Sequence, residues 1–156
     1  MPEVVELYAV DDLCVGALGP PGRRVFVISA AKGSDRVTVA VEKEQVALLA
    51  REATQFLDKL AEEYPEERTF VEMGAGSLRE PVEPLFRARL IGIGFDPDDQ
   101  MVLVELRESA VDEAASEETG SGDEGWVARF FATRAQVRAL ASSGLDAVQA
   151  GRARWN

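Results

Sequence analysis

The chain has 156 residues, of which 46% are hydrophobic and 29% charged, and its net charge is −11. These proportions are those of an ordinary globular protein and exclude a disordered, collagen-like or disulfide-stapled class. The length fits a single domain with a substantial core. We divide it into a first half of about 1–65, a connection 66–85 and a second half 86–150.

Histidine is absent and Cys14 is the one cysteine in the sequence. A histidine general base, a Ser-His-Asp triad and a His-ligated zinc are therefore excluded within this chain. A single thiol gives neither an intrachain disulfide nor a structural zinc site, so we expect no metal and no cofactor. Residues 1–11 lack the basic and apolar runs of a leader, and no segment is apolar enough to span a membrane. We expect a cytoplasmic protein.

Four segments of the first half are predicted strands, because apolar residues recur in them with a period of two. They are residues 4–9, 13–18, 24–30 and 36–41. The turn sequence Gly19-Pro20-Pro21-Gly22 separates the second strand from the third, and Lys32-Gly33-Ser34-Asp35 separates the third from the fourth. Both connections favour antiparallel hairpins.

A long helix is predicted over residues 43–64, where the apolar period changes to that of a helix. The stripe consists of Val46, Leu49, Ala50, Ala53, Phe56, Leu57, Leu60, Ala61 and Tyr64. Pro65 ends it, because proline cannot continue a helix.

The second half repeats this order of elements. Three strands are predicted at 86–94, 101–106 and 126–132, with the aspartate-rich turn 96–99 between the first two. Thr133 and Gln136 have the spacing of a capping box, so a helix is expected to begin there. Gly144 is expected to end it, and residues 145–150 to add one more helical turn.

Matching residues recur in the two halves at two fixed separations. Gly16 matches Gly92, and residues 25–28 match 101–104, in both cases 76 positions later. The helix residues Lys43, Gln45, Val46, Leu49 and Ala50 match Arg134, Gln136, Val137, Leu140 and Ala141, 91 positions later. The difference of 15 is close to the length of an acidic insertion at 108–124. Either the chain is an internal duplication, or similar packing needs produced two similar patterns.

These elements predict an α+β fold. The sheet is expected to be antiparallel or mixed, built from two similar strand-strand-strand-helix halves, with the helices on one face.

Charge is distributed unevenly along the second half. Residues 108–124 contain seven acids and no Lys or Arg, whereas residues 125–156 contain five Arg and one Asp. The acidic insertion is either a solvated loop or a cover for the basic end that a partner displaces. The acidic overall balance makes nucleic acid an unlikely partner.

Five segments together resemble one protein family. They are Gly16-x-x-Gly19-x-Pro21-Gly22-x-Arg24-x-Phe26, Glu42-Lys43-x-Gln45-Val46, Phe86-Arg87-x-x-x-Ile91-Gly92-x-Gly94-Phe95, Ala132-Thr133-Arg134-x-Gln136 and Ala150-Gly151-Arg152. The family is a domain of unknown function among conserved hypothetical proteins of high-GC bacteria, so the resemblance implies no activity. Its members commonly continue into a Cys-rich tail similar to a zinc ribbon. This sequence stops at Arg154-Trp155-Asn156 without those cysteines. Either the tail was lost or the chain was cut, and in both cases no zinc role carries over.

Five residues are candidates for binding a ligand. Arg24, Glu42 and Arg134 offer anion binding and carboxylate chemistry without histidine, at a site expected between the two halves. Gly74 and Gly76 lie in the long connection, where a loop of this length can carry function or can need unusual backbone angles.

Other polar motifs have simpler readings. The turn before Arg24 lacks the Lys-Ser or Lys-Thr of a phosphate-binding loop. Asp96, Asp98 and Asp99 are read as a turn rather than a calcium site, and Cys14 as a small buried residue rather than a nucleophile.

The absence of any catalytic signature favours a non-catalytic protein-interaction or adaptor module with an unidentified protein partner. The alternative is a small-ligand or anion-binding protein, or a histidine-independent enzyme, with its site between the halves. Whether the chain forms a homodimer stays open, and no membrane partner is expected.

Overall fold

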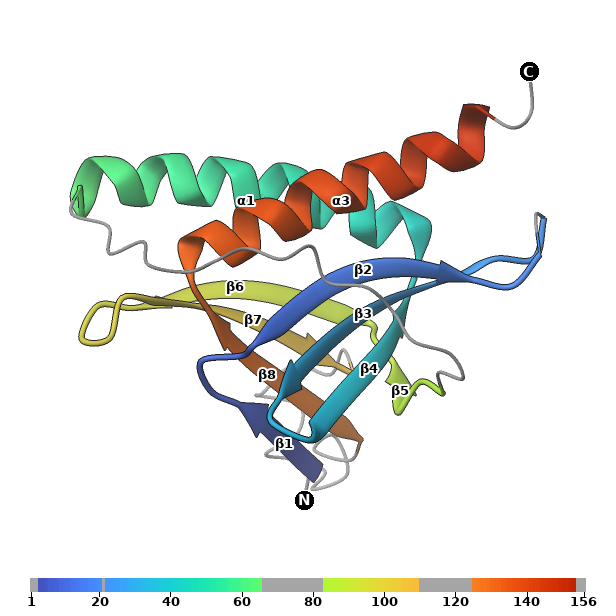
Figure 1. Cartoon of the computed structure of the whole chain (residues 1–156), viewed down its shortest axis with the longest axis horizontal. Coiled ribbons are helices and arrows are strands. Elements are labelled where there is room, and N and C mark those ends of the chain that lie inside the picture. Colours follow the sequence, from blue (N-terminus) through green and yellow to red (C-terminus); the bar gives the residue numbers. More distant parts are fainter. Residues whose placement is uncertain (1–2, 21, 66–82, 110–124, 154–156) are drawn as a thin grey trace, which may run out of the picture.

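Two four-stranded sheets and two long helices make up the described chain (Figure 1). The computed structural model describes residues 3–20, 22–65, 83–109 and 125–153. Its elements are β1 (Glu3–Leu7), β2 (Asp12–Leu18), β3 (Val25–Lys32), β4 (Asp35–Val41), α1 (Lys43–Glu63), β5 (Phe86–Arg87), β6 (Leu90–Asp96), β7 (Met101–Arg107), β8 (Trp126–Ala132) and α3 (Arg134–Ala153). The predicted α+β class is confirmed, as is the mixed pairing. Residues 110–124 of the acidic insertion and Trp155 lie outside the described residues.

The two halves exchange one strand each. One sheet has the order β2-β3-β4-β5 and the other β1-β8-β7-β6. In each sheet three strands form an antiparallel meander and the fourth is parallel to its neighbour. Strand β1 precedes the first meander but pairs with β8, and β5 precedes the second meander but pairs with β4. Each half therefore completes the sheet of the other.

The strand registers agree with both separations in the sequence and change one of the matched pairs. Phe26 pairs with Val41 and Val102 with Ala132, so the register of β3 with β4 recurs 76 and 91 positions later in β7 and β8. The match of Gly16 to Gly92 is wrong by two residues, because Gly16 lies opposite Val27 and Gly94 lies opposite Leu103. The reason is that six residues connect β2 to β3 and four connect β6 to β7.

Two glutamines join the halves in the same way. The side chain of Gln45 donates to the carbonyl of Ala88 (3.2 Å), and that of Gln136 donates to the carbonyl of Val10 (2.8 Å). The Oε1 atom of each glutamine also accepts the N–H of the residue that caps its own helix. Each helix start is thus fixed to backbone of the opposite half. The predicted capping box at Thr133 is confirmed.

One apolar cluster connects both sheets and both helices. Alternate residues of β7, Val102, Val104 and Leu106, are fully buried, as a strand with one face on the core requires. The predicted stripe of the first helix is confirmed at its buried residues Val46, Leu49, Ala50, Ala53, Leu57 and Leu60. Phe56 and Tyr64 are half-buried, and the prediction is wrong for Ala61, which is exposed. Both helices lie on the same side of the sheets, where α3 crosses α1 (Figure 1).

The expected end of the second helix at Gly144 is wrong. Helix α3 continues through Gly144 to Ala153. A Cβ atom at Gly144 would lie 3.1 Å from Cγ1 of Val46 and 3.7 Å from Cγ2 of Val15. Glycine in a helix interior costs about 1 kcal/mol relative to alanine, and here it permits close packing of α3 on α1 and β2. Within the described ranges, no helix is long and apolar enough to cross a membrane.

Candidate functional site

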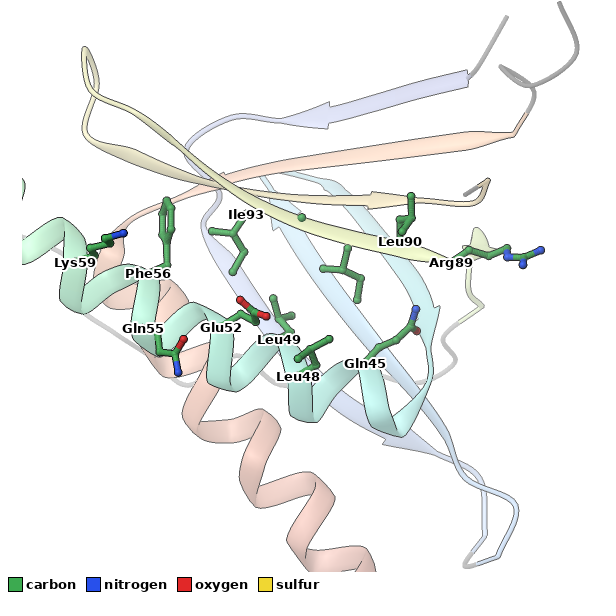
Figure 2. Close-up of a pocket in the computed structure, with 12 residues that line it drawn as sticks. Gln45, Leu48, Leu49, Glu52, Gln55, Phe56, Lys59, Arg89, Leu90 and Ile93 are labelled. Atoms are coloured by element: carbon green, nitrogen blue, oxygen red, sulfur yellow. The ribbon is translucent and has the colours of Figure 1, made fainter. Parts of the chain in front are cut away.

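A cleft of about 590 Å³ lies between helix α1 and strand β6 (Figure 2). Leu48, Leu49 and Phe56 form the wall on α1, and Leu90, Ile91 and Ile93 that on β6. Its volume lies within the range of about 300–1,000 Å³ that is typical of ligand sites. Because α1 belongs to the first half and β6 to the second, the cleft lies between the halves, where the sequence analysis placed a ligand site.

Large apolar side chains in this cleft reach solvent. Leu48 is 48% exposed and Leu90 is 47% exposed. Leu48 lies beside the buried stripe of α1, on the side of the helix that faces the cleft. Its neighbour Leu49 is buried. A molecule that covered these leucines would gain about 25 cal/mol for each Å² of apolar surface removed from water.

Strand β6 has a free edge at this cleft. It is the last strand of its sheet and pairs only with β7 among the described strands. Five consecutive residues, 89–93, line the cleft. Side chains alternate between the two faces of a strand, so consecutive lining residues place the edge of β6 at the cleft wall. An unpaired edge presents backbone N–H and C=O groups that can bind another strand.

The equivalent place in the other half is more closely packed at Gly144, where a Cβ atom would lie 3.7 Å from Cγ2 of Val15 in β2. At the separation of 91, Leu48, Glu52 and Phe56 of α1 correspond to Ala139, Ser143 and Ala147 of α3. These smaller residues lie on the same helix as Gly144, where α3 packs closely on β2. On α1 the larger residues face β6 across open space (Figure 2). The two halves therefore differ at the cleft, where α1 packs less closely on β6 than α3 does on β2.

Charged side chains lie at both ends of the cleft and at its middle. Figure 2 shows Lys59 and Arg89 at opposite ends and Glu52 between them. Within the described ranges, none of these three side chains has an ion pair or hydrogen bond. By contrast, Arg87 is paired with Glu42 at 2.7 Å.

Arg24, Glu42 and Arg134 are not among the residues that line this cleft. Arg24 lies just before β3 and is half-buried, and Glu42 caps α1 and pairs with Arg87. In the part of the chain that the structure describes, no hydrogen bond or ion pair joins Arg24, Glu42 and Arg134 to one another. Gly74 and Gly76 lie outside the described residues. A ligand role for these five residues stays a prediction.

Arg134 connects three elements from a buried position. It is 5% exposed, and its guanidinium donates from Nη1 to the carbonyl of Tyr64 and from Nη2 to Oε1 of Gln100, both at 2.8 Å. The guanidinium carbon lies 5.4 Å from the ring centre of Phe95. A cation beside the last carbonyls of α1 is favoured by the helix dipole. Arg134 thus joins the end of α1 to strand β6 and the β6–β7 turn.

Sequence reasoning missed Leu48, Glu52 and Arg89 as cleft residues. It selected charged residues at motif positions, whereas the cleft depends on the distance between a helix and a strand. The sequence does contain one signal for this cleft. At matched positions the side chains of α1 are larger than those of α3, and this difference indicates that the two helices pack differently on their sheets.

The aspartate-rich segment 96–99 and Cys14 have the contacts and burial expected of a turn and of a small buried residue. The N–H of Asp98 donates to the carboxylate of Asp96 at 3.0 Å, as in an aspartate turn. Cys14 is buried, and burial raises the pKa of its thiol to about 11. A hydrogen bond to Asp99 raises the pKa of Tyr8 to about 12.

Glu105 holds two arginines on the sheet of β6, β7 and β8. Its carboxylate accepts Nε–H groups from Arg129 at 2.8 Å and Arg107 at 2.9 Å. Burial by itself would raise the pKa of Glu105, but the hydrogen bonds from Arg129 and Arg107 hold this pKa below its ordinary 4.5.

We expect Glu105→Gln to lower the free energy of unfolding at pH 7 by about 1 kcal/mol. Because the folded-state pKa of Glu105 is depressed, its contribution is full above the unfolded-state pKa and is lost as pH falls through the folded-state value. Urea unfolding from pH 7 to pH 3 measures this difference, with Glu62→Gln, an exposed acid of α1, as control. A destabilisation that stayed constant below pH 4 would contradict the ion-pair explanation.

The fold and the cleft define an α+β protein of two interlocked halves with a ligand-sized cleft between them. Residues 6–155 match the family model described as Protein of unknown function (DUF3090), and the chain belongs to this family. No curated protein and no solved structure matches the chain. The bacterial origin and the missing Cys-rich tail stay predictions.

Proposed function

We propose that the protein is a non-catalytic interaction module that holds an extended segment of a partner protein between α1 and β6. The observation that carries this proposal is the free edge of β6 at the cleft wall, opposite the apolar side chains of α1. An extended segment can add to such an edge through backbone hydrogen bonds. Its alternate side chains can then enter the apolar part of the cleft.

Strand addition already completes both sheets within this chain. Strands β1 and β5 each join, in parallel, a meander of the other half. They lie beside β8 and β4, so the outer strands of the described sheets are β1 and β6 in one and β2 and β5 in the other. Among these four outer strands of the described sheets, β6 is the one whose residues line the cleft.

The length of the cleft fits a short strand. Along α1 it extends from Gln45 to Lys59. A helix rises 1.5 Å per residue, so this distance is about 21 Å. An extended chain covers it with about six residues at 3.3 Å each.

The cleft volume also supports the second candidate, a small amphipathic ligand, because about 590 Å³ accommodates a molecule of ordinary ligand size. The two candidates differ in what they need from β6. A segment that adds as a strand uses the backbone edge of β6, whereas a small ligand needs only the apolar walls.

A random-peptide library displayed on phage tests the proposal on the purified full chain. We expect enriched peptides that bind with micromolar affinity, followed by methylation of one backbone nitrogen at a time in the best peptide. Because one side of a strand faces β6, affinity should fall at every second methylated position.

Two outcomes of this experiment contradict the proposal. One is a library from which no peptide is enriched. The other is affinity that is insensitive to methylation or is lost with a helical period. If thermal-shift screening of small amphipathic molecules raises the Tm while no peptide is enriched, the second candidate takes its place.

We further propose that the chain arose by internal duplication and acts in the cytoplasm. The paired registers and the reciprocal contacts of Gln45 and Gln136 support the duplication, because similar packing needs alone do not require the same crossed hydrogen bonds. An alignment of family members tests it. Conservation of both glutamines together is expected, and independent replacement of either would contradict it.

A further inference from the structure

We infer that the segment held in the cleft carries acidic side chains at both ends and none at its centre. This inference rests on the proposed function and adds the chemistry of the partner segment. It follows from three charges in the cleft: Lys59 at one end, Arg89 at the other and Glu52 between them (Figure 2).

The two end cations are available to a ligand. Two other arginines have carboxylate partners, Arg87 with Glu42 at 2.7 Å and Arg138 with Asp58 at 3.5 Å. The side chains of Lys59 and Arg89 have no such partner within residues 3–20, 22–65, 83–109 and 125–153. Carboxylates of a bound segment would supply the missing partners, and Arg89 can bind a carboxylate through two parallel N–H groups.

Glu52 determines which side chains of the bound segment can lie at the centre of the cleft. It lies one helical turn from Leu48 and one from Phe56, so its carboxylate stands between two apolar side chains of the same wall. An acidic side chain placed opposite it would be repelled, whereas a hydroxyl, amide or cation would be accepted. The charges of the cleft therefore favour one pattern along the segment.

The spacing of the two acids follows from the length of α1 between the cleft ends. The distance of about 21 Å corresponds to about six residues of extended chain. The expected segment has an acid, then four or five residues with apolar side chains at alternate positions, then a second acid. A uniformly charged polyanion does not fit this pattern because of Glu52.

Exposed charges at the end of a cleft change affinity modestly and in a salt-dependent way. We expect a three- to ten-fold loss for reversal of either cation at low salt, and a smaller loss at 0.5 M salt. This salt dependence separates the end charges from the apolar contacts, which salt does not weaken.

Parallel selections from the same random-peptide library test the inference. One selection uses the unchanged protein and the other the double variant Lys59→Glu/Arg89→Glu. We expect peptides with two acids about six residues apart from the first and peptides with basic residues at those positions from the second. The double variant Arg23→Glu/Arg51→Glu alters two exposed arginines outside the cleft, makes the same change in net charge and should select the same peptides as the unchanged protein.

The outcomes separate this inference from the proposed function. If all three proteins select peptides with the same charge pattern, and those peptides still add to β6 by the methylation test, the proposed function stands and this inference is overturned. If both double variants shift the selected charges equally, the effect is one of net charge and the inference is likewise overturned. If no protein selects any peptide, both fail.

Discussion

Arg134→Ala is expected to lower the free energy of unfolding by about 3 kcal/mol, because charged hydrogen bonds contribute about 1.5–3 kcal/mol each. The variant removes both hydrogen bonds of the guanidinium, to the carbonyl of Tyr64 and to Oε1 of Gln100, and leaves these half-buried oxygens without their donor. It also removes the aliphatic stem from the ring of Phe95. For a chain of this size we expect the Tm to fall by about 9 °C.

Arg138 provides the matched control on the same helix. It is an exposed arginine whose ion pair with Asp58, at 3.5 Å, is exposed on both sides. Its replacement by alanine should change stability by less than about 0.5 kcal/mol. Urea unfolding followed by fluorescence measures both variants. Equal effects of Arg134→Ala and Arg138→Ala would contradict the joining role of Arg134.

Gly92→Val is expected to reduce affinity for a library-selected peptide at least ten-fold while leaving the fold unchanged. A Cβ atom at Gly92 would meet no other atom within 4 Å, and Gly92 lines the cleft. By the alternation of side chains along β6, the valine would lie on the same face as Leu90, beside the edge at which the bound segment adds. Stability should stay within about 0.5 kcal/mol or rise slightly, because valine favours strands. Fluorescence polarisation with the labelled peptide, together with a melting curve, measures both effects.

Gly94→Val separates a blocked cleft from a general change in β6. Gly94 lies two residues further along the same strand face and is not among the cleft residues. A Cβ atom there would be in ordinary contact with Leu103, at 3.7 Å. We expect peptide affinity to stay within two-fold of the unchanged protein. Unaltered binding by Gly92→Val, or equal losses for both variants, would contradict the placement of the site.

Local structure was predictable because it depends on short-range periodicity and capping. The stripe from Val46 to Leu60 and the box formed by Thr133 and Gln136 are both properties of neighbouring residues. Gly144 was misjudged, because its role depends on Val46 and Val15, which are distant in sequence. A glycine that breaks an isolated helix can be the residue that lets two helices approach.

Strand order was not predictable, because the pattern of a strand carries no information about which strand lies beside it. Nothing within residues 3–7 indicates that β1 leaves its own half to pair with β8. The division into two sheets follows from this exchange. The repeat of the sequence did indicate two similar halves, and the registers of β3 with β4 and of β7 with β8 preserve it.

The cleft between the halves is lined by residues other than those predicted from the sequence. Arg24, Glu42 and Arg134 were chosen for their charge, and the structure places two of them in contacts that hold helix ends. Leu48 and Leu90 gave no signal by charge or motif. Their importance comes from the space between α1 and β6, which is a property of packing across the two halves.

Amide hydrogen exchange of the full chain, with and without a library-selected peptide, tests the strand-addition account most directly. Bound peptide should slow exchange of alternate amides in β6, residues 90–96, because these N–H groups then donate to the added strand. The corresponding strand β2, residues 12–18, is the internal control and should not change. Protection at β2 or elsewhere, with β6 unaffected, would contradict the account.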